Sequence, residues 1–239
     1  MAAVEHPSEV LPPLWLAPDE ARLAQLLPRD STDLAGFYPR LKAYVSETPR
    51  RRAGSVDHAA IVRGDIVYQG PDSVIEAGAI IHDSCRLVLG PGSVVRSGAI
   101  LRDEVVIGPR CRIGAHCEVA RTVILGPDTY LGHYVFAGDS SIGRGAVLAG
   151  NVFIANTKVG SRRAIQMRLG GRPIESGRNQ LGALVGDGVR FGASTTLCPG
   201  CVVLPNLSLP PGVILHGTID AQRRRTLMRR FRTMWAADA

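Results

Sequence analysis

Residues 107–119 read "IGPRCRIGAHCEV", and this stretch decides the fold of the chain. An aliphatic residue recurs at every sixth position, at Ile107, Ile113 and Val119. A period of six fits neither an α-helix nor a strand with one buried face, whose periods are about 3.6 and 2 residues. It fits a triangular coil of short strands, in which each side takes six residues and points one aliphatic side chain inward.

The repeat extends far beyond this stretch in both directions. An aliphatic, aromatic or small apolar residue recurs, with a slip of one residue before Ile142 and other interruptions, at Ile75, Ile81, Leu89, Val95, Leu101, Leu125, Leu131, Ala137, Ile142, Leu148, Ile154, Val185, Phe191, Leu197, Val203, Leu209 and Leu215. So long a repeat predicts a mainly β protein, a parallel β-helix built from hexapeptide repeats. Its coils of about 18 residues stack by backbone hydrogen bonds around an inner aliphatic column.

Composition agrees with this fold and limits the function. The chain has 239 residues, of which 45% are hydrophobic and only 5% aromatic, and it contains 27 glycines, which suits a turn-rich solenoid. Its net charge is +7, and only Lys42 and Lys158 among the 28 cations are lysines. Arginine forks suit phosphorylated small molecules or CoA. We expect no nucleic-acid partner and no membrane partner. We find no signal sequence or apolar membrane-spanning run, so we expect a cytoplasmic protein.

The cysteines follow the repeat. Cys85, Cys111, Cys117 and Cys201 each lie four residues after a repeat aliphatic, in the small inward-facing position of the coil. We therefore expect buried free thiols there, with no metal site and no disulfide. Cys198 directly follows a repeat aliphatic, and the pattern leaves its environment open.

The repeat divides the chain into three parts. Residues 1–54 form an N-terminal helical segment, with two short helices expected within 18–46, and a basic linker. Residues 55–219 form the β-helix. Residues 220–239 form a basic amphipathic helix, expected to dock on the coil wall or on a neighbouring subunit. Its apolar stripe is Leu227, Met228, Phe231, Met234 and Trp235.

Residues 155–184 interrupt the repeat, and we call this segment the arm. Within it, "AIQMRLGGRPIES" (164–176) predicts a β-hairpin with Gly-Gly at the tip. The arm carries six cations against Glu175 alone. A long excursion from a regular solenoid is usually functional, so we expect it to bind an anionic ligand such as phosphate or the CoA diphosphate. A hairpin that clips onto the next subunit is the alternative.

Three stretches resemble a known family. "LGHYVFAGDSSIGRGAVLAGNVFIAN" (131–156), "SGRNQLGALVGDGVRFGASTTLCPG" (176–200) and "LPPGVIL" (209–215) resemble the C-terminal β-helical domain of sugar-1-phosphate nucleotidylyltransferase/acetyltransferase enzymes, including glucosamine-1-phosphate acetyltransferase domains. The resemblance spans roughly residues 60–219 and implies a left-handed coil, a homotrimer and acetyl-CoA as acyl donor. Residues 1–60 are too short for the nucleotidylyltransferase half, so we expect no sugar-nucleotide synthesis by this chain alone.

The resemblance also implies roles for individual residues. His133 matches the general base that takes a proton from an attacking amine, and Asn156 matches an asparagine that positions the acceptor sugar. Arg102 and Arg121 fall near basic residues that hold the sugar phosphate, and Arg162, with Lys158 close by, falls where the family has an arm lysine. Tyr134 lies beside the expected acceptor site. For the CoA phosphates we expect Arg163, Arg168, Arg172 and Arg178.

Phe136 departs from the family, which has a tyrosine three residues after the histidine. Together with arginines in place of arm lysines, it favours either a changed acceptor or a lost activity. The first hypothesis is therefore a CoA-dependent acyltransferase that N-acetylates an amino sugar or amino-sugar phosphate. The second is a non-catalytic trimeric scaffold or regulatory partner of a nucleotidylyltransferase. A third is a zinc enzyme of the γ-carbonic anhydrase type, for which only His82, His116 and His133 are candidate ligands.

Overall fold

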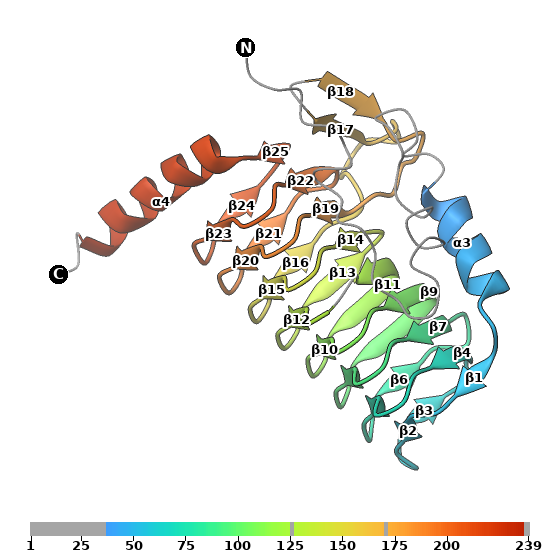
Figure 1. Cartoon of the computed structure of the whole chain (residues 1–239). Helices are drawn as coiled ribbons and strands as arrows, with labels where there is room; N and C mark the ends of the chain where they lie inside the picture. The colour runs from blue at the N-terminus through green and yellow to red at the C-terminus, as the bar shows by residue number, and fades with distance from the viewer. Residues whose placement is uncertain (1–36, 125–126, 170–171, 237–239) are drawn as a thin grey trace.

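The computed structural model describes residues 37–236 except 125–126 and 170–171. It is a mainly β parallel solenoid, as the repeat predicts (Figure 1). Short strands pair in parallel with the strand one coil below and one coil above, for example Ile113 with Val95 and Leu131. The coil has three faces, which meet at turns.

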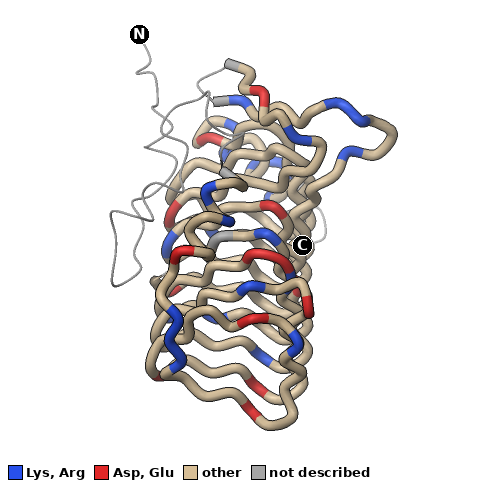
Figure 2. The backbone as a smooth tube through the Cα atoms, turned by 90° about the vertical axis from the view of Figure 1, so that its right-hand side faces the viewer, with Lys and Arg blue, Asp and Glu red and all other residues tan. Residues whose placement is uncertain are grey.

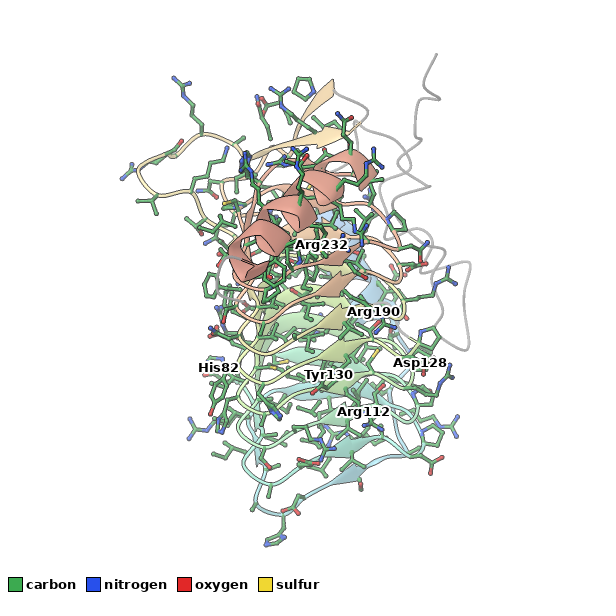
Figure 3. All side chains as sticks on the ribbon, turned by 90° about the vertical axis from the view of Figure 1, so that its left-hand side faces the viewer. His82, Arg112, Asp128, Tyr130, Arg190 and Arg232 are labelled. Atoms are coloured by element: carbon green, nitrogen blue, oxygen red, sulfur yellow. The ribbon has the colours of Figure 1, made fainter. Side chains whose placement is uncertain are left out.

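One face is a separate eight-stranded sheet. Its strands are β2 (Ser55–Val56), β5 (Val74–Ile75), β8 (Val94–Val95), β10 (Arg112–Ile113), β12 (Tyr130–Leu131), β15 (Val147–Leu148), β20 (Arg190–Phe191) and β23 (Ser208–Leu209). Figure 3 looks at this side of the molecule, where Arg112, Tyr130 and Arg190 follow one another up the stack.

The other two faces form one fifteen-stranded sheet, because β9 (Ile100–Ile107) and β11 (Glu118–Ile124) run across the corner between them. The second face contains the first halves of β9 and β11 with β3 (Ile61–Val62), β6 (Ile80–Ile81), β13 (Phe136–Gly138), β16 (Phe153–Ile154), β21 (Thr196–Leu197) and β24 (Ile214–Leu215). The third contains their second halves with β1 (Arg51–Arg52), β4 (Asp65–Gln69), β7 (Arg86–Leu89), β14 (Ser141–Ile142), β19 (Ala183–Val185), β22 (Cys201–Val203) and β25 (Thr218–Ile219).

The repeat aliphatics form the inner column, and those in the described residues are at most 5% exposed. One position differs from the repeat. Ile124 is fully buried and pairs with Ile107 and Ile142, where the six-residue spacing expects Leu125, which lies outside the described residues. This shift of one residue arises at the corner of the coil that precedes Ile124. Arg121 alone stands opposite the two residues Asp103 and Glu104, so this side is one residue shorter.

The third face is covered by other parts of the chain, and we call it the covered face. Helix α3 (Phe37–Glu47) packs Leu41 and Val45 over Val88 and Val106. The hairpin expected in the arm is present as β17 (Gln166–Leu169) and β18 (Arg172–Glu175), which pair antiparallel. It folds back onto the coil, and its buried residues Ile165, Met167 and Ile174 join Leu184 and Val202 in the same apolar cluster.

Helix α3 agrees with the second of the two expected N-terminal helices, while the first lies outside the described residues. Helix α4 (Ala221–Ala236) follows the last coil, and Asp220 caps it by accepting the N–H of Arg223 at 2.7 Å. Leu227 packs against the inner column, and the helix continues past the end of the stack (Figure 1). No helix in the described part of the chain combines the length and apolar character needed to cross a bilayer.

The four cysteines of the small inward positions are buried as expected, each at most 1% exposed, and all belong to the inner cluster. Cys198 is partly exposed, and all five thiols are free. Burial raises the pKa of Cys117 to about 11 and that of Cys111 and Cys201 to about 12. Because the thiolate is the reactive form, these side chains are inert packing groups.

Candidate functional site

No other segment of the described residues covers the second face of the coil, and this face carries the residues that the sequence singles out. We call it the bare face. Its outward column is mostly apolar, with Phe153 47% and Ile214 68% exposed. The register sets this column as Ile61, Ile80, Ile100, Glu118, Phe136, Phe153, Thr196 and Ile214. An apolar column of this length without cover in the described chain is typical of a contact surface.

His133 is exposed at one edge of the bare face, in the turn between β12 and β13. Its Nδ1 accepts the backbone N–H of Ala115, one coil below, at 3.3 Å. In this orientation the proton of the neutral imidazole sits on Nε2. A base acting through Nε2 needs the proton on Nδ1, so the ring must leave the Ala115 N–H before it can take a proton by that atom.

The same turn column holds an aromatic pair. His116 and Tyr134 both have positive φ, 57° and 60°, and their rings stack with centroids 5.2 Å apart. Tyr134 is 63% exposed. The ring of His116 therefore lies on Tyr134, and the described residues contain no group of three His, Cys, Asp or Glu side chains that could hold a metal ion.

Phe136 and Phe153 form the middle of the bare face. Their rings stack with centroids 4.8 Å apart and an interplanar angle of 19°. Gly138 lies just beyond them, and a Cβ there would stand 2.8 Å from Nδ2 of Asn156. The glycine thus lets Asn156 lie close to the strand, next to the ring of Phe136. Phe136 supplies an apolar surface at the place where the family has a hydroxyl.

Asn156 lies at the other edge of the bare face, bound to a buried carboxylate. Its Nδ2 donates to Oδ2 of Asp139 at 2.6 Å, and the Asp139 side chain is fully buried. Arg121 donates to both oxygens of Asp139, at 2.9 and 3.0 Å, and also pairs with Asp103. The guanidinium of Arg121 is thus held between two carboxylates.

Two more arginines join this group. Arg102 donates to Glu118 at 2.7 Å and lies 3.5 Å from Asp103. Arg178, where the arm returns to the coil, lies 3.8 Å from Asp139 and stacks over the ring of Tyr38 at 3.9 Å. Burial lowers the pKa of Arg178 below its usual value, Asp139 opposes this, and Arg121 adds to it. We call these side chains the ion cluster: Arg102, Asp103, Glu118, Arg121, Asp139 and Arg178.

The remaining arm cations lie elsewhere. Lys158, Arg162 and Arg163 are exposed on a loop that stands out from the stack, where Val159 is fully exposed (Figure 2). Arg168 is exposed on the hairpin, and the side chain of Arg172 lies outside the described residues. The exposed loop cations are free to meet an anionic ligand, whereas Arg178 is engaged in the ion cluster.

The structure thus brings Asn156, Arg102, Arg121 and Arg178 together, with Phe136 beside them, and places His133 and Tyr134 at the opposite edge. Asp103, Glu118 and Asp139 were not among the site residues predicted from the sequence. A signal was present, since Asp103, Arg121 and Asp139 are spaced by 18 residues, one coil apart, and residues one coil apart lie on top of each other.

Comparisons with known proteins agree with the resemblance. No protein-family model matches the chain. A bifunctional sugar-1-phosphate nucleotidylyltransferase/acetyltransferase of Sulfurisphaera tokodaii is 27% identical over 167 residues, which are 68% of this chain and 39% of that protein. The bifunctional protein GlmU of Methanococcus maripaludis is 26% identical over 110 residues, 46% of this chain and 26% of that protein. An uncharacterized acetyltransferase, YaiX, of Escherichia coli is 27% identical over 120 residues, 50% of this chain and 51% of its own length.

This chain therefore spans about two-fifths or less of the bifunctional relatives. Among solved structures, the polysialic acid O-acetyltransferase OatWY matches with a TM-score of 0.38 and 15% identity, over 71% of this chain and 77% of that chain. PerB from Caulobacter crescentus, in complex with CoA and GDP-perosamine, matches with a TM-score of 0.22 and 20% identity, over 70% of this chain and 55% of that chain.

Proposed function

We propose that this chain, a hexapeptide-repeat homologue of sugar-1-phosphate nucleotidylyltransferase/acetyltransferases, is a CoA-dependent acyltransferase that acetylates the amine of an amino sugar or amino-sugar phosphate. The observation that carries the proposal is the bare face, with exposed His133 at one edge and Asn156 at the other. Sequence similarity to proteins named acetyltransferases supports it.

His133 is the general base of this proposal. An amine that attacks a thioester must lose a proton, and an imidazole with a pKa near neutrality can take it. For this step the ring turns away from the Ala115 N–H, which frees that N–H. The freed group is then a donor for the oxygen on which negative charge develops.

Phe136 and Phe153 provide the apolar wall of the site, and Lys158, Arg162 and Arg163 on the exposed loop provide cations for the CoA phosphates. His133 and Asn156 lie at opposite edges of one face. A second copy of the chain against the bare face would close the site, so we propose a homotrimer whose sites lie between subunits.

The first experiment is acetyl-CoA binding by calorimetry to the wild type and to His133→Ala. Both should bind with micromolar affinity, but the variant should lose about 10²- to 10⁴-fold in acetyl transfer to amino sugars, the usual contribution of a general base. His58→Ala is the matched control, because its side chain is 96% exposed at the far end of the stack. Absence of CoA binding to a folded oligomer would refute the proposal.

A second candidate is a non-catalytic scaffold or regulatory partner. Phe136 favours it, because the site lacks a hydroxyl there. In that case the oligomer forms, acetyl-CoA does not bind, and His133→Ala changes nothing that can be measured.

A further inference from the structure

The ion cluster raises the question of which acceptor fits at the Asn156 edge, a question that rests on the proposed function. The cluster contains three guanidinium groups and three carboxylates, linked by ion pairs of 2.7 to 3.8 Å and by the close contact between Arg121 and Asp103. Its formal charge is therefore zero. A phosphate approaching this edge meets no excess positive charge.

Arg121 cannot readily leave the cluster. Its side chain is 18% exposed, and it provides two hydrogen bonds to Asp139, whose side chain is fully buried. Turning Arg121 toward a ligand would leave that carboxylate with Asn156 at 2.6 Å and Arg178 at 3.8 Å. Removing a partner from a buried ion pair is strongly unfavourable, because the remaining charge stays desolvated.

Asp103 pairs with the Nη1 atoms of Arg102 and Arg121. It lies at the junction of Arg102 and Arg121, with its carboxylate in contact with both, and its side chain is 25% exposed. Without Asp103, the Nη1 atoms of the two arginines would lose their shared carboxylate partner at the surface. Two such guanidinium groups would form a phosphate site.

Asn156 also limits which group of a ligand can bind at this edge. A carboxylate only accepts hydrogen bonds, so the amide must turn its Nδ2 to Asp139 and keep Oδ1 for other partners. Thr157 donates to that Oδ1 at 3.3 Å, from an exposed position. A ligand that displaces the threonine hydroxyl must itself be a donor, such as a sugar hydroxyl or amine.

We propose that Asp103 is a specificity-determining residue, which neutralises Arg102 and Arg121 and makes the Asn156 edge select an acceptor that carries no phosphate there. The acceptor class is a sugar without a phosphate, or the phosphate-free part of a larger acceptor. Any phosphate of the acceptor then lies away from this edge, outside the reach of Arg102 and Arg121.

The test uses Asp103→Asn, which removes the charge and keeps the shape. Asn tolerates the left-handed backbone of position 103, where φ is 61°. The matched control is Asp128→Asn, because Asp128 has φ 62° and pairs with Arg110 at 2.9 Å, at a turn outside the ion cluster. Kinetics compare glucosamine with glucosamine 1-phosphate, using acetyl-CoA as donor.

We expect the wild type to favour glucosamine over glucosamine 1-phosphate by at least tenfold in kcat/KM. Asp103→Asn should raise the ratio of kcat/KM for the 1-phosphate to kcat/KM for glucosamine at least fivefold, whereas Asp128→Asn should leave this ratio unchanged. A wild-type preference for the 1-phosphate, or an unchanged ratio in Asp103→Asn, would overturn the proposal.

A second measurement does not depend on turnover. Inorganic phosphate binding is measured by calorimetry on the full chain. Asp103→Asn should gain a phosphate site that is absent in the wild type and in Asp128→Asn, and Arg121→Gln added to Asp103→Asn should abolish it. If Asp103→Asn gains no phosphate site, the specificity role is wrong whatever the enzyme activity. If the site appears but acetyl-CoA never binds, the specificity chemistry holds and the acyltransferase proposal falls.

Discussion

The covered face and the bare face share the two long strands β9 and β11, yet their outer surfaces differ. On the covered face, Val106 is fully buried and Leu184 is 3% exposed, because α3 and the hairpin pack on them. On the bare face, Phe153 and Ile214 are 47% and 68% exposed. The inward side chains of the repeat fill the interior in the same way behind the covered face and the bare face. The two faces differ in whether another described segment of the chain packs on their outer side chains.

The two faces therefore have different roles. The covered face stabilises the coil, because its outward aliphatics add a second apolar cluster to the inner column. The bare face leaves apolar surface for a partner or ligand, and His133 and Asn156 lie at its edges.

The two faces should differ most in how fast their cysteine thiols react. Cys198 follows β21 at an edge of the bare face and is partly exposed, while Cys201, which begins β22 on the covered side, points inward and is fully buried. A thiol reagent at neutral pH should modify Cys198 at once. The other four should react only through the unfolded fraction, about 10⁻³ or less of the molecules. Modification of more than one thiol in the native protein, counted by mass spectrometry, would contradict the buried inner positions.

Leu184→Ala tests the energetic part of the comparison. Truncating this covered leucine should lower the free energy of unfolding by about 2–5 kcal/mol, through lost apolar burial and a cavity. Ile214→Ala on the bare face should change the unfolding free energy of the monomeric chain by about 0.5 kcal/mol or less, because its side chain is 68% exposed there. Urea unfolding of both variants under conditions in which the chain is monomeric measures the difference. Equal losses in the monomer would contradict the exposure of the bare face in the single chain.

The paired substitution Phe153→Glu and Ile214→Glu tests whether a second copy covers the bare face. Like charges placed in an apolar interface oppose association, so the mass by light scattering should fall from a trimer to a monomer. Far-UV circular dichroism should stay unchanged, because both side chains are exposed in the single chain. Val159→Glu, at a fully exposed loop position, is the control that should keep the mass. A trimer that survives the double substitution would place the interface elsewhere.

A smaller loss of unfolding free energy is expected at a contact that links α3, on the covered face, to the ion cluster at the edge of the bare face. Tyr38 of α3 carries Arg178 over its ring at 3.9 Å, and Arg178 reaches Asp139 of the ion cluster. Tyr38→Leu removes this ring and should cost about 0.5–1 kcal/mol of unfolding free energy, the usual size of such a contact. Tyr38→Phe keeps the ring and should retain most of it. Thermal unfolding of the two variants compares them, and equal losses would exclude the ring as the cause.

Much of the interior could be predicted from the sequence, because the six-residue period indicates which residue on each side of the coil points inward. The buried cysteines followed from the same rule, as did the hairpin from its Gly-Gly tip. The short corner at Arg121 is the exception. Backbone pairing with Asp103 and Glu104 sets where the slip falls, and it puts Ile124 inside, one residue before the position that the spacing of six predicts.

The candidate site was less accessible to such rules. By resemblance, Arg121 falls near a basic residue that holds the sugar phosphate, but the structure holds its guanidinium between Asp103 and Asp139. Spacing along the chain could have suggested these partners, but not that Asp139 is fully buried or that Arg178 returns to it from the arm. Those facts depend on where the arm re-enters the coil, at Gly182, whose N–H binds the Asp139 carbonyl at 2.9 Å.

The coil, its inner column and the places of its turns thus follow from the amino-acid sequence alone, because a solenoid repeats one local rule and each coil contacts only its neighbours. Which face is covered, how the cations are paired and which residues surround Asn156 are evident only from the three-dimensional arrangement. Those outcomes depend on α3, the arm and the coils meeting in space. Their contacts join residues that are separated by up to 140 positions in the chain, as in the contact of Arg178 with the ring of Tyr38, and no local period encodes them.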